Sequence, residues 1–100
     1  MMRDKIIEEN KLVEVDSWSF GAMYDWAEME MFYSKELNRF FWLEGSGCSC
    51  TYLWDLVNSL ADMCDGTRQS AANAVRAFAE ANRSEYYGDI ATAANKVLGF

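Results

Sequence analysis

The sequence predicts an α+β fold, with an N-terminal antiparallel sheet of about three strands packed against two or three C-terminal helices. Two observations support this. Residues before Gly47 are rich in strand-forming aromatic side chains, whereas residues after it are rich in alanine and other helix formers. The chain has 100 residues, of which 51% are hydrophobic and 15% aromatic, enough for one buried core. We therefore expect a single domain over residues 1–100, with the sheet in 11–46 and the helices in 51–98.

The strands are expected between short polar breaks. Residues 1–10 are mostly charged and predict a frayed or helical lead-in. Residues 11–15 alternate weakly between apolar and polar side chains, which favours a first strand. Residues 22–33 alternate more clearly and predict a second strand. After a turn at 34–38, residues 39–43 predict the strand that completes a hairpin.

A helix is the rival interpretation for residues 16–33. The strand pattern places Met29 and Met31 on one face, and Glu28 and Glu30 on the other. However, Phe20, Met23, Ala27 and Met31 also fit a period of 3.6 residues. We favour the strand.

The second half predicts helices by apolar spacing and by capping residues. Thr51 is a suitable N-cap for a helix over 52–64, whose apolar residues are spaced as one buried stripe. Thr67 is a suitable N-cap for an alanine-rich helix that ends at Ala81. Residues 90–98 predict a terminal helix, although one bent helix through 84–89 also fits the apolar spacing.

Composition excludes several classes of function. The net charge of −7 and the pI near 4.4 disfavour direct binding to nucleic-acid phosphates, which requires a basic surface. No apolar run approaches the roughly 18 residues of a membrane-spanning helix, and the N-terminus lacks the apolar core of a signal peptide. With three cysteines the chain is not a disulfide scaffold, so a reducing cytoplasm is the expected location.

The run Gly45-Ser46-Gly47-Cys48-Ser49-Cys50 predicts a loop that is either a backbone turn or a site. In the structural interpretation, the glycines adopt positive φ and one or both cysteines pack as small buried side chains. In the alternative, Cys48 and Cys50 bind a metal or undergo thiol chemistry. Cys64 is a poor third ligand, because a straight helix would place it about 20 Å from Thr51. The chain has no histidine to activate a thiol, so we expect no catalytic residue, no cofactor and no enzyme activity.

Residues 41–50, Phe-Trp-Leu-Glu-Gly-Ser-Gly-Cys-Ser-Cys, together with Trp54-Asp55, resemble a family of small uncharacterised proteins from bacteriophages of actinobacteria. Its mark is an aromatic strand followed by a Ser-Gly-Cys-Ser-Cys loop. Tyr24-Asp25-Trp26-Ala27 also resembles the first hairpin strand of that family, and the resemblance covers residues 20–56. Proline commonly follows the loop in the family, whereas Thr51 and Tyr52 stand here. The resemblance implies a viral origin and no known activity.

Between Lys11 and Lys35 the sequence is acidic and aromatic, with no basic residue. Aromatic side chains in a negative field are typical of protein interfaces that attract a basic partner. We therefore expect a non-enzymatic phage protein of the host cytoplasm that modulates a host protein with a basic surface, for example by mimicking nucleic-acid charge. Self-association through a strand edge or the alanine-rich helix is a further expectation. The predicted contact residues are Trp18, Tyr24, Trp26, Glu28 and Glu30.

Overall fold

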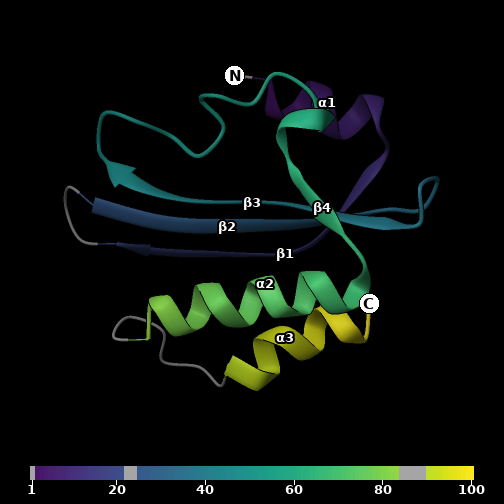
Figure 1. Ribbon diagram of the computed structural model, residues 1–100. Coiled ribbons are helices and arrows are strands. Elements are labelled where there is room, and N and C mark those ends of the chain that lie inside the picture. Colours follow the sequence, from purple (N-terminus) through teal and green to yellow (C-terminus); the bar gives the residue numbers. More distant parts are fainter. Residues whose placement is uncertain (1, 22–24, 84–89) are drawn as a thin grey trace.

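The computed structural model describes residues 2–21, 25–83 and 90–100 and has the predicted α+β fold (Figure 1). Four antiparallel strands form one sheet in the order β1-β2-β3-β4. Along the chain the elements are α1 (Arg3–Glu9), β1 (Leu12–Gly21), β2 (Asp25–Ser34), β3 (Arg39–Cys48), the short 3-10 helix η1 (Leu60–Asp62), β4 (Cys64–Gly66), α2 (Arg68–Ala81) and α3 (Ile90–Leu98).

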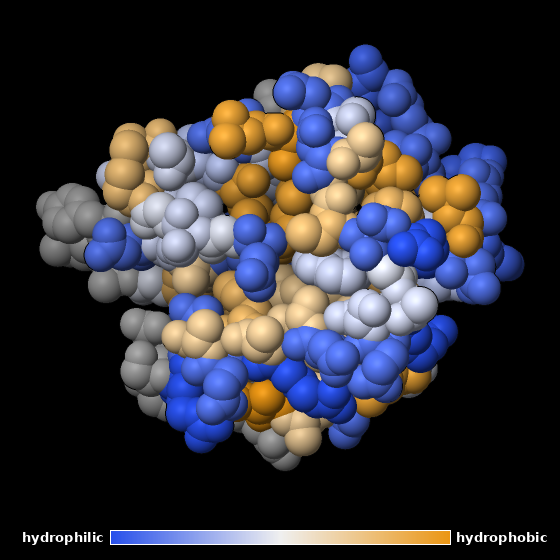
Figure 2. Space-filling view, viewed as in Figure 1, coloured by the Kyte–Doolittle hydropathy of each residue, from blue (hydrophilic) through white to orange (hydrophobic). Residues whose placement is uncertain are grey.

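The sheet separates two hydrophobic cores. Figure 1 shows α2 and α3 together on one face, here called the helical face, and α1 with the chain before β4 on the other, here called the loop face. The core of the helical face is formed mainly by Met29, Met31, Phe40, Val75, Phe78, Ala94 and Val97. The core of the loop face is formed by Ile6, Leu12, Phe32, Phe41, Leu43, Trp54, Val57 and Met63. In the same view, hydrophilic residues cover much of the helical layer (Figure 2).

Strand β2 confirms the strand interpretation over its described residues. Met29 and Met31 are completely buried on the helical face, and Phe32 is completely buried on the loop face. Large apolar side chains on both faces suit the period of two, because a helix would place them on a single stripe. Residues 22–24 lie outside the described residues. A β-bulge between Glu14 and Asp16 interrupts the pairing of β1 with β2.

The predicted turn between β2 and β3 is present. The Ser34 hydroxyl accepts a hydrogen bond from the Leu37 backbone N–H at 3.1 Å. Asn38 adopts a left-handed backbone with φ of 51°, and its side-chain oxygen accepts from the Tyr33 hydroxyl at 2.6 Å. Asparagine tolerates this conformation better than most residues, so local chemistry sets the turn.

The predicted helix over 52–64 is wrong. This segment consists of turns, η1 and the start of β4, and it covers the loop face. Polar side chains replace helical bonds: Asp55 accepts from the Tyr52 N–H at 2.8 Å, and Asp62 accepts from the backbone N–H groups of Asn58 and Ser59 at 2.9 and 3.2 Å. Such local bonds compete with helix formation. Leu56, expected in the buried stripe, is 88% exposed.

The two C-terminal helices agree with the sequence. The Thr67 hydroxyl caps α2 by accepting from the Ser70 N–H at 3.1 Å. Buried alanines on both helices let α2 and α3 pack closely, so this small-residue face is already used within the chain. The Arg68 guanidinium donates to the carbonyls of Val97 and Phe100 at 2.9 and 2.7 Å, which fixes the end of α3.

We expect Phe32→Ala to lower the free energy of unfolding by about 3–5 kcal/mol, because it opens a cavity in the loop-face core. Urea denaturation followed by circular dichroism measures this. Leu56→Ala removes a large apolar side chain that is exposed and serves as the control, with a change within about 0.5 kcal/mol. Equal losses in both variants would contradict the burial of Phe32 in the loop-face core.

Candidate protein-binding surface

The predicted contact residues lie on both faces of the sheet, and three of them border one cavity. Strand alternation places Trp26, Glu28 and Glu30 on the loop face, together with Phe32. Trp18 pairs with Met29 in register and packs, partly buried, against the core of the helical face. Tyr24 lies outside the described residues. Trp18 nevertheless lines a surface cavity that Glu28 and Glu30 also border, so it stays a predicted contact residue.

Glu30 is a structural group rather than a free contact residue. One carboxylate oxygen accepts from Nε and Nη2 of Arg3 at 3.1 and 2.8 Å, and the other accepts from the Trp54 indole N–H. The Glu30 side chain is only 15% exposed. The hydrogen bond to Glu30 raises the pKa of Arg3, so the guanidinium stays charged. Glu30 thus ties α1 and the covering segment to the centre of the sheet.

Trp26 explains Gly47, one of the two glycines of β3. Gly47 lies opposite Trp26 in register, and a Cβ added there would lie 3.0 Å from the indole ring and 2.5 Å from the Thr51 hydroxyl. A Cβ at Gly45 would lie 3.2 Å from Cδ1 of Leu53 and 3.7 Å from the same ring, the latter an ordinary contact. No described glycine has positive φ, so the predicted role of these glycines in a left-handed turn is wrong. Gly47 is required because the indole ring of Trp26 lies across the strand, whereas Gly45 is crowded mainly by Leu53.

Glu28 is a free acidic group on the loop face. It has no hydrogen-bond or ion-pair partner among the residues that the structure describes. It borders a surface cavity of about 280 Å³ whose other lining residues include Ser17, Ser19, Tyr52, Leu53 and Trp54. Tyr52 is 64% exposed, so the cavity combines a free carboxylate with an accessible aromatic ring.

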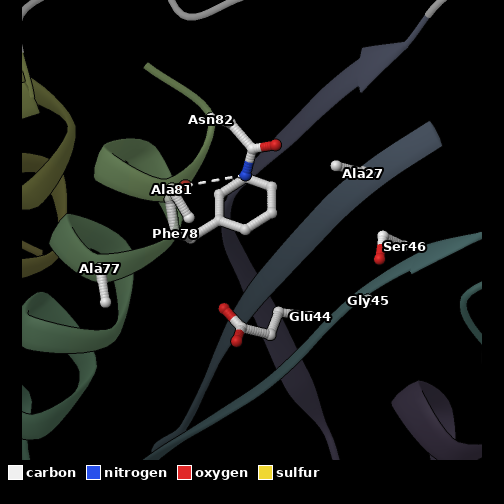
Figure 3. A pocket seen from close by; sticks show the side chains of 8 residues that line it. All are labelled: Ala27, Glu44, Gly45, Ser46, Ala77, Phe78, Ala81 and Asn82. Atoms are coloured by element: carbon white, nitrogen blue, oxygen red, sulfur yellow. Dashed lines mark hydrogen bonds between the residues drawn. The ribbon is translucent and has the colours of Figure 1, made fainter. Parts of the chain in front are cut away.

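A second cleft, of about 400 Å³, lies on the helical face between the end of α2 and strands β2 and β3 (Figure 3). Phe78 and Asn82 line it from the helix, and Glu44 extends from β3. The Asn82 amide is engaged, because it donates to the Phe78 carbonyl at 2.8 Å. The remaining lining residues are Ala27, Gly45, Ser46, Ala77 and Ala81. Its polar side chains are the Glu44 carboxylate, the Ser46 hydroxyl and the engaged Asn82 amide.

The cysteines do not assemble a metal site. Cys48 and Cys50 are exposed and form a disulfide with each other, so the prediction of buried cysteines is wrong. Cys64 lies opposite Trp42 of β3, and Trp42 precedes Cys48 by six residues on that strand. At about 3.4 Å per residue, Cys64 is therefore roughly 20 Å from Cys48. Within residues 2–21, 25–83 and 90–100, no three metal-ligating side chains come together.

Comparison with known proteins identifies a family. A family model described as "Domain of unknown function (DUF7574)" matches residues 5–98, so the chain belongs to this family. No curated protein and no solved structure matches the chain. Over the part of the chain that the structure describes, no helix is long and apolar enough to span a membrane.

Gly47→Ala should lower the free energy of unfolding by about 1–3 kcal/mol, because its methyl group would overlap the space held by Trp26 and Thr51. Thermal or urea unfolding measures the loss. Ser46→Ala is the matched control, since Ser46 is exposed and faces the other side of the strand; its effect should stay within about 0.5 kcal/mol. A Gly47→Ala variant as stable as the wild type would contradict the close packing of Trp26 and Thr51 against Gly47.

Glu30→Gln should lower the free energy of unfolding by about 1–2 kcal/mol, because it weakens the charge-assisted bonds to Arg3 while solvent still screens part of the pair. Glu28→Gln makes the same chemical change at a carboxylate without a described partner and should change stability by less than about 0.5 kcal/mol. The two variants are compared by urea denaturation. The same loss of stability in both variants would contradict the structural role of the Glu30 carboxylate.

Proposed function

We propose that this member of the DUF7574 family is a non-enzymatic binding protein that docks a basic segment of a partner protein on its loop face. The observation that carries the proposal is the unpaired carboxylate of Glu28, which borders a cavity beside the exposed ring of Tyr52. The proposed contact residues are Trp26, Glu28, Tyr52 and Asp55. Trp26 and Glu28 are retained from the sequence prediction. Glu30 is left out because Arg3 and Trp54 hold its carboxylate, and Trp18 because it is partly buried against the core of the helical face.

Charge distribution along the sheet supports a basic partner. At the Trp26 end, Asp25, Glu28 and Asp55 contribute negative charge, and the basic residue that lines the cavity, Arg3, is already paired with Glu30. The basic residues Lys11, Lys35 and Arg39 lie at the opposite end, beside the β2–β3 turn. The acidic end would therefore attract cations without competition from basic residues of its own.

The side chains at this end suit a protein interface. Tyrosine and tryptophan contribute strongly to binding when a partner covers them, because they bury a large area and also carry a polar group. Leu56, on the same covering segment, is a large apolar side chain that is 88% exposed. A lysine or arginine of the partner would enter the cavity and pair with Glu28, while Tyr52 packs along its aliphatic part.

The resemblance of residues 20–56 to phage proteins makes a host protein the proposed partner, met in the host cytoplasm. A nucleic-acid-binding host factor would fit, because its basic surface would recognise the acidic end of the sheet as it recognises phosphates. A thiol-dependent module is the second candidate function, favoured by the exposed Cys48–Cys50 pair.

Glu28→Lys should reduce capture of the partner by tenfold or more, because it places a like charge in front of a basic group. The immobilised protein is incubated with host extract, and proteins enriched over a blank resin are quantified by mass spectrometry. Glu44→Lys makes the same charge change on the helical face and should preserve capture. Tyr52→Ala, at an exposed position, should also weaken capture without affecting the fold.

Capture should also fall as salt rises, since screening weakens attraction between exposed charges. A protein captured equally by the wild type and by Glu28→Lys would contradict the proposed surface. Loss in Glu44→Lys with retention in Glu28→Lys would place the interface on the helical face instead.

A further inference from the structure

Cys48 and Cys50 are a pair of reactive groups that the proposed docking surface does not use. Cys48 is the last residue of β3, Cys50 follows in the turn, and both are exposed. They form a disulfide across Ser49 with Cα atoms 5.5 Å apart, a separation that disulfides commonly span. Exposure makes this bond accessible to small reagents.

The backbone around the pair is held by other contacts. The Cys48 carbonyl accepts from the Trp26 indole N–H at 2.8 Å, from the Thr51 N–H at 3.2 Å and from the Thr51 hydroxyl at 3.4 Å. These bonds do not involve sulfur, so they keep the two thiols close after reduction. A link between residues so close in sequence also constrains the unfolded chain very little. Stabilisation of the fold is therefore a poor explanation for this bond.

We propose that Cys48 and Cys50 form a reversible dithiol–disulfide site that exchanges with low-molecular-weight disulfides. The thiolate of one cysteine attacks a sulfur of the small disulfide RSSR, forming a mixed disulfide and releasing RS⁻, which takes up a proton. The second thiolate then attacks the protein sulfur of the mixed disulfide and releases the second RS⁻, which is also protonated. The protein loses two electrons and two protons, and RSSR becomes two RSH.

The charges around the pair select the reagent. Asp25 lies directly opposite Cys48 in register, and side chains in such cross-strand pairs are about 4.5–5.5 Å apart at Cβ. This carboxylate attracts a cationic disulfide and repels an anionic one. The site therefore favours cystamine, which carries two ammonium groups, over oxidised glutathione, which is net negative.

The exchange is tested in the Cys64→Ser variant, because Cys64 is a third exposed thiol. The protein is equilibrated with reduced and oxidised glutathione at varied ratios, acid-quenched and alkylated, and its intact mass is measured. As the proportion of oxidised glutathione rises, the thiols of Cys48 and Cys50 should become unavailable to the alkylating reagent together. Both should react with it again when the proportion falls. In Cys48→Ser with Cys64→Ser, Cys50 has no partner and should accumulate a mixed disulfide with glutathione.

Three results would overturn the proposal: independent addition of glutathione to each cysteine, a pair that stays reduced at the most oxidising ratio, or a pair that stays oxidised at the most reducing one. The reduced pair should react several-fold faster with cystamine than with oxidised glutathione at low salt, and Asp25→Asn should narrow the difference. Equal rates in the protein with Asp25 would overturn the charge preference. These results do not depend on whether a partner protein docks at Glu28.

Discussion

The central strand β2 buries large side chains on both of its faces, and the rest of the fold follows from this constraint. Met29 and Met31 require a cover on one side, and Phe32 requires a cover on the other. Each such side chain left in water would forfeit about 1.5–3 kcal/mol of stabilisation. The two C-terminal helices meet the first requirement. The second falls to the short helix α1 and to the segment before β4, which has little regular structure of its own.

An irregular cover needs polar contacts that hold it in place. Glu30 supplies one from the centre of the sheet, because it accepts hydrogen bonds from Arg3 of α1 and from Trp54 of the covering segment. Asp55 and Asp62 supply others by accepting from backbone N–H groups within the segment. The side chains with free chemistry, namely Glu28, Tyr52 and the Cys48–Cys50 pair, lie beside this cover. This is the usual division between a rigid scaffold and functional loops.

The parts of the fold visible in the sequence were those governed by local rules. The period of two in β2, the turn at Ser34 and the Thr67 cap each depend on residues close in sequence. Residues 52–64 were mispredicted because the spacing of their apolar side chains suits a helix, while burial against Phe41 and Phe32 favours turns instead.

The candidate site was likewise predictable only where residues close in sequence determine it. Strand alternation alone placed Glu28 and Glu30 together, but it said nothing of Trp18 across the neighbouring strand. It also could not distinguish a free acid from a structural one. The partner that binds Glu30 is Arg3, 27 residues away, and only the folded chain brings the two together. Equally, nothing near Gly47 in the sequence indicates that Trp26 lies over it.

The outer strands of the sheet also decide how another molecule can approach. On one side, the bulge between Glu14 and Asp16 breaks the regular row of backbone donors and acceptors along β1. On the other, β4 is only three residues long. What stays open to a further strand is two short stretches, Asp16–Gly21 of β1 beyond the bulge and Leu43–Cys48 of β3 beyond the end of β4, each with a partner strand on one side only. An added strand could therefore extend the sheet over one such stretch and not along its whole border, so the side chains that flank the stretch would decide which strand fits.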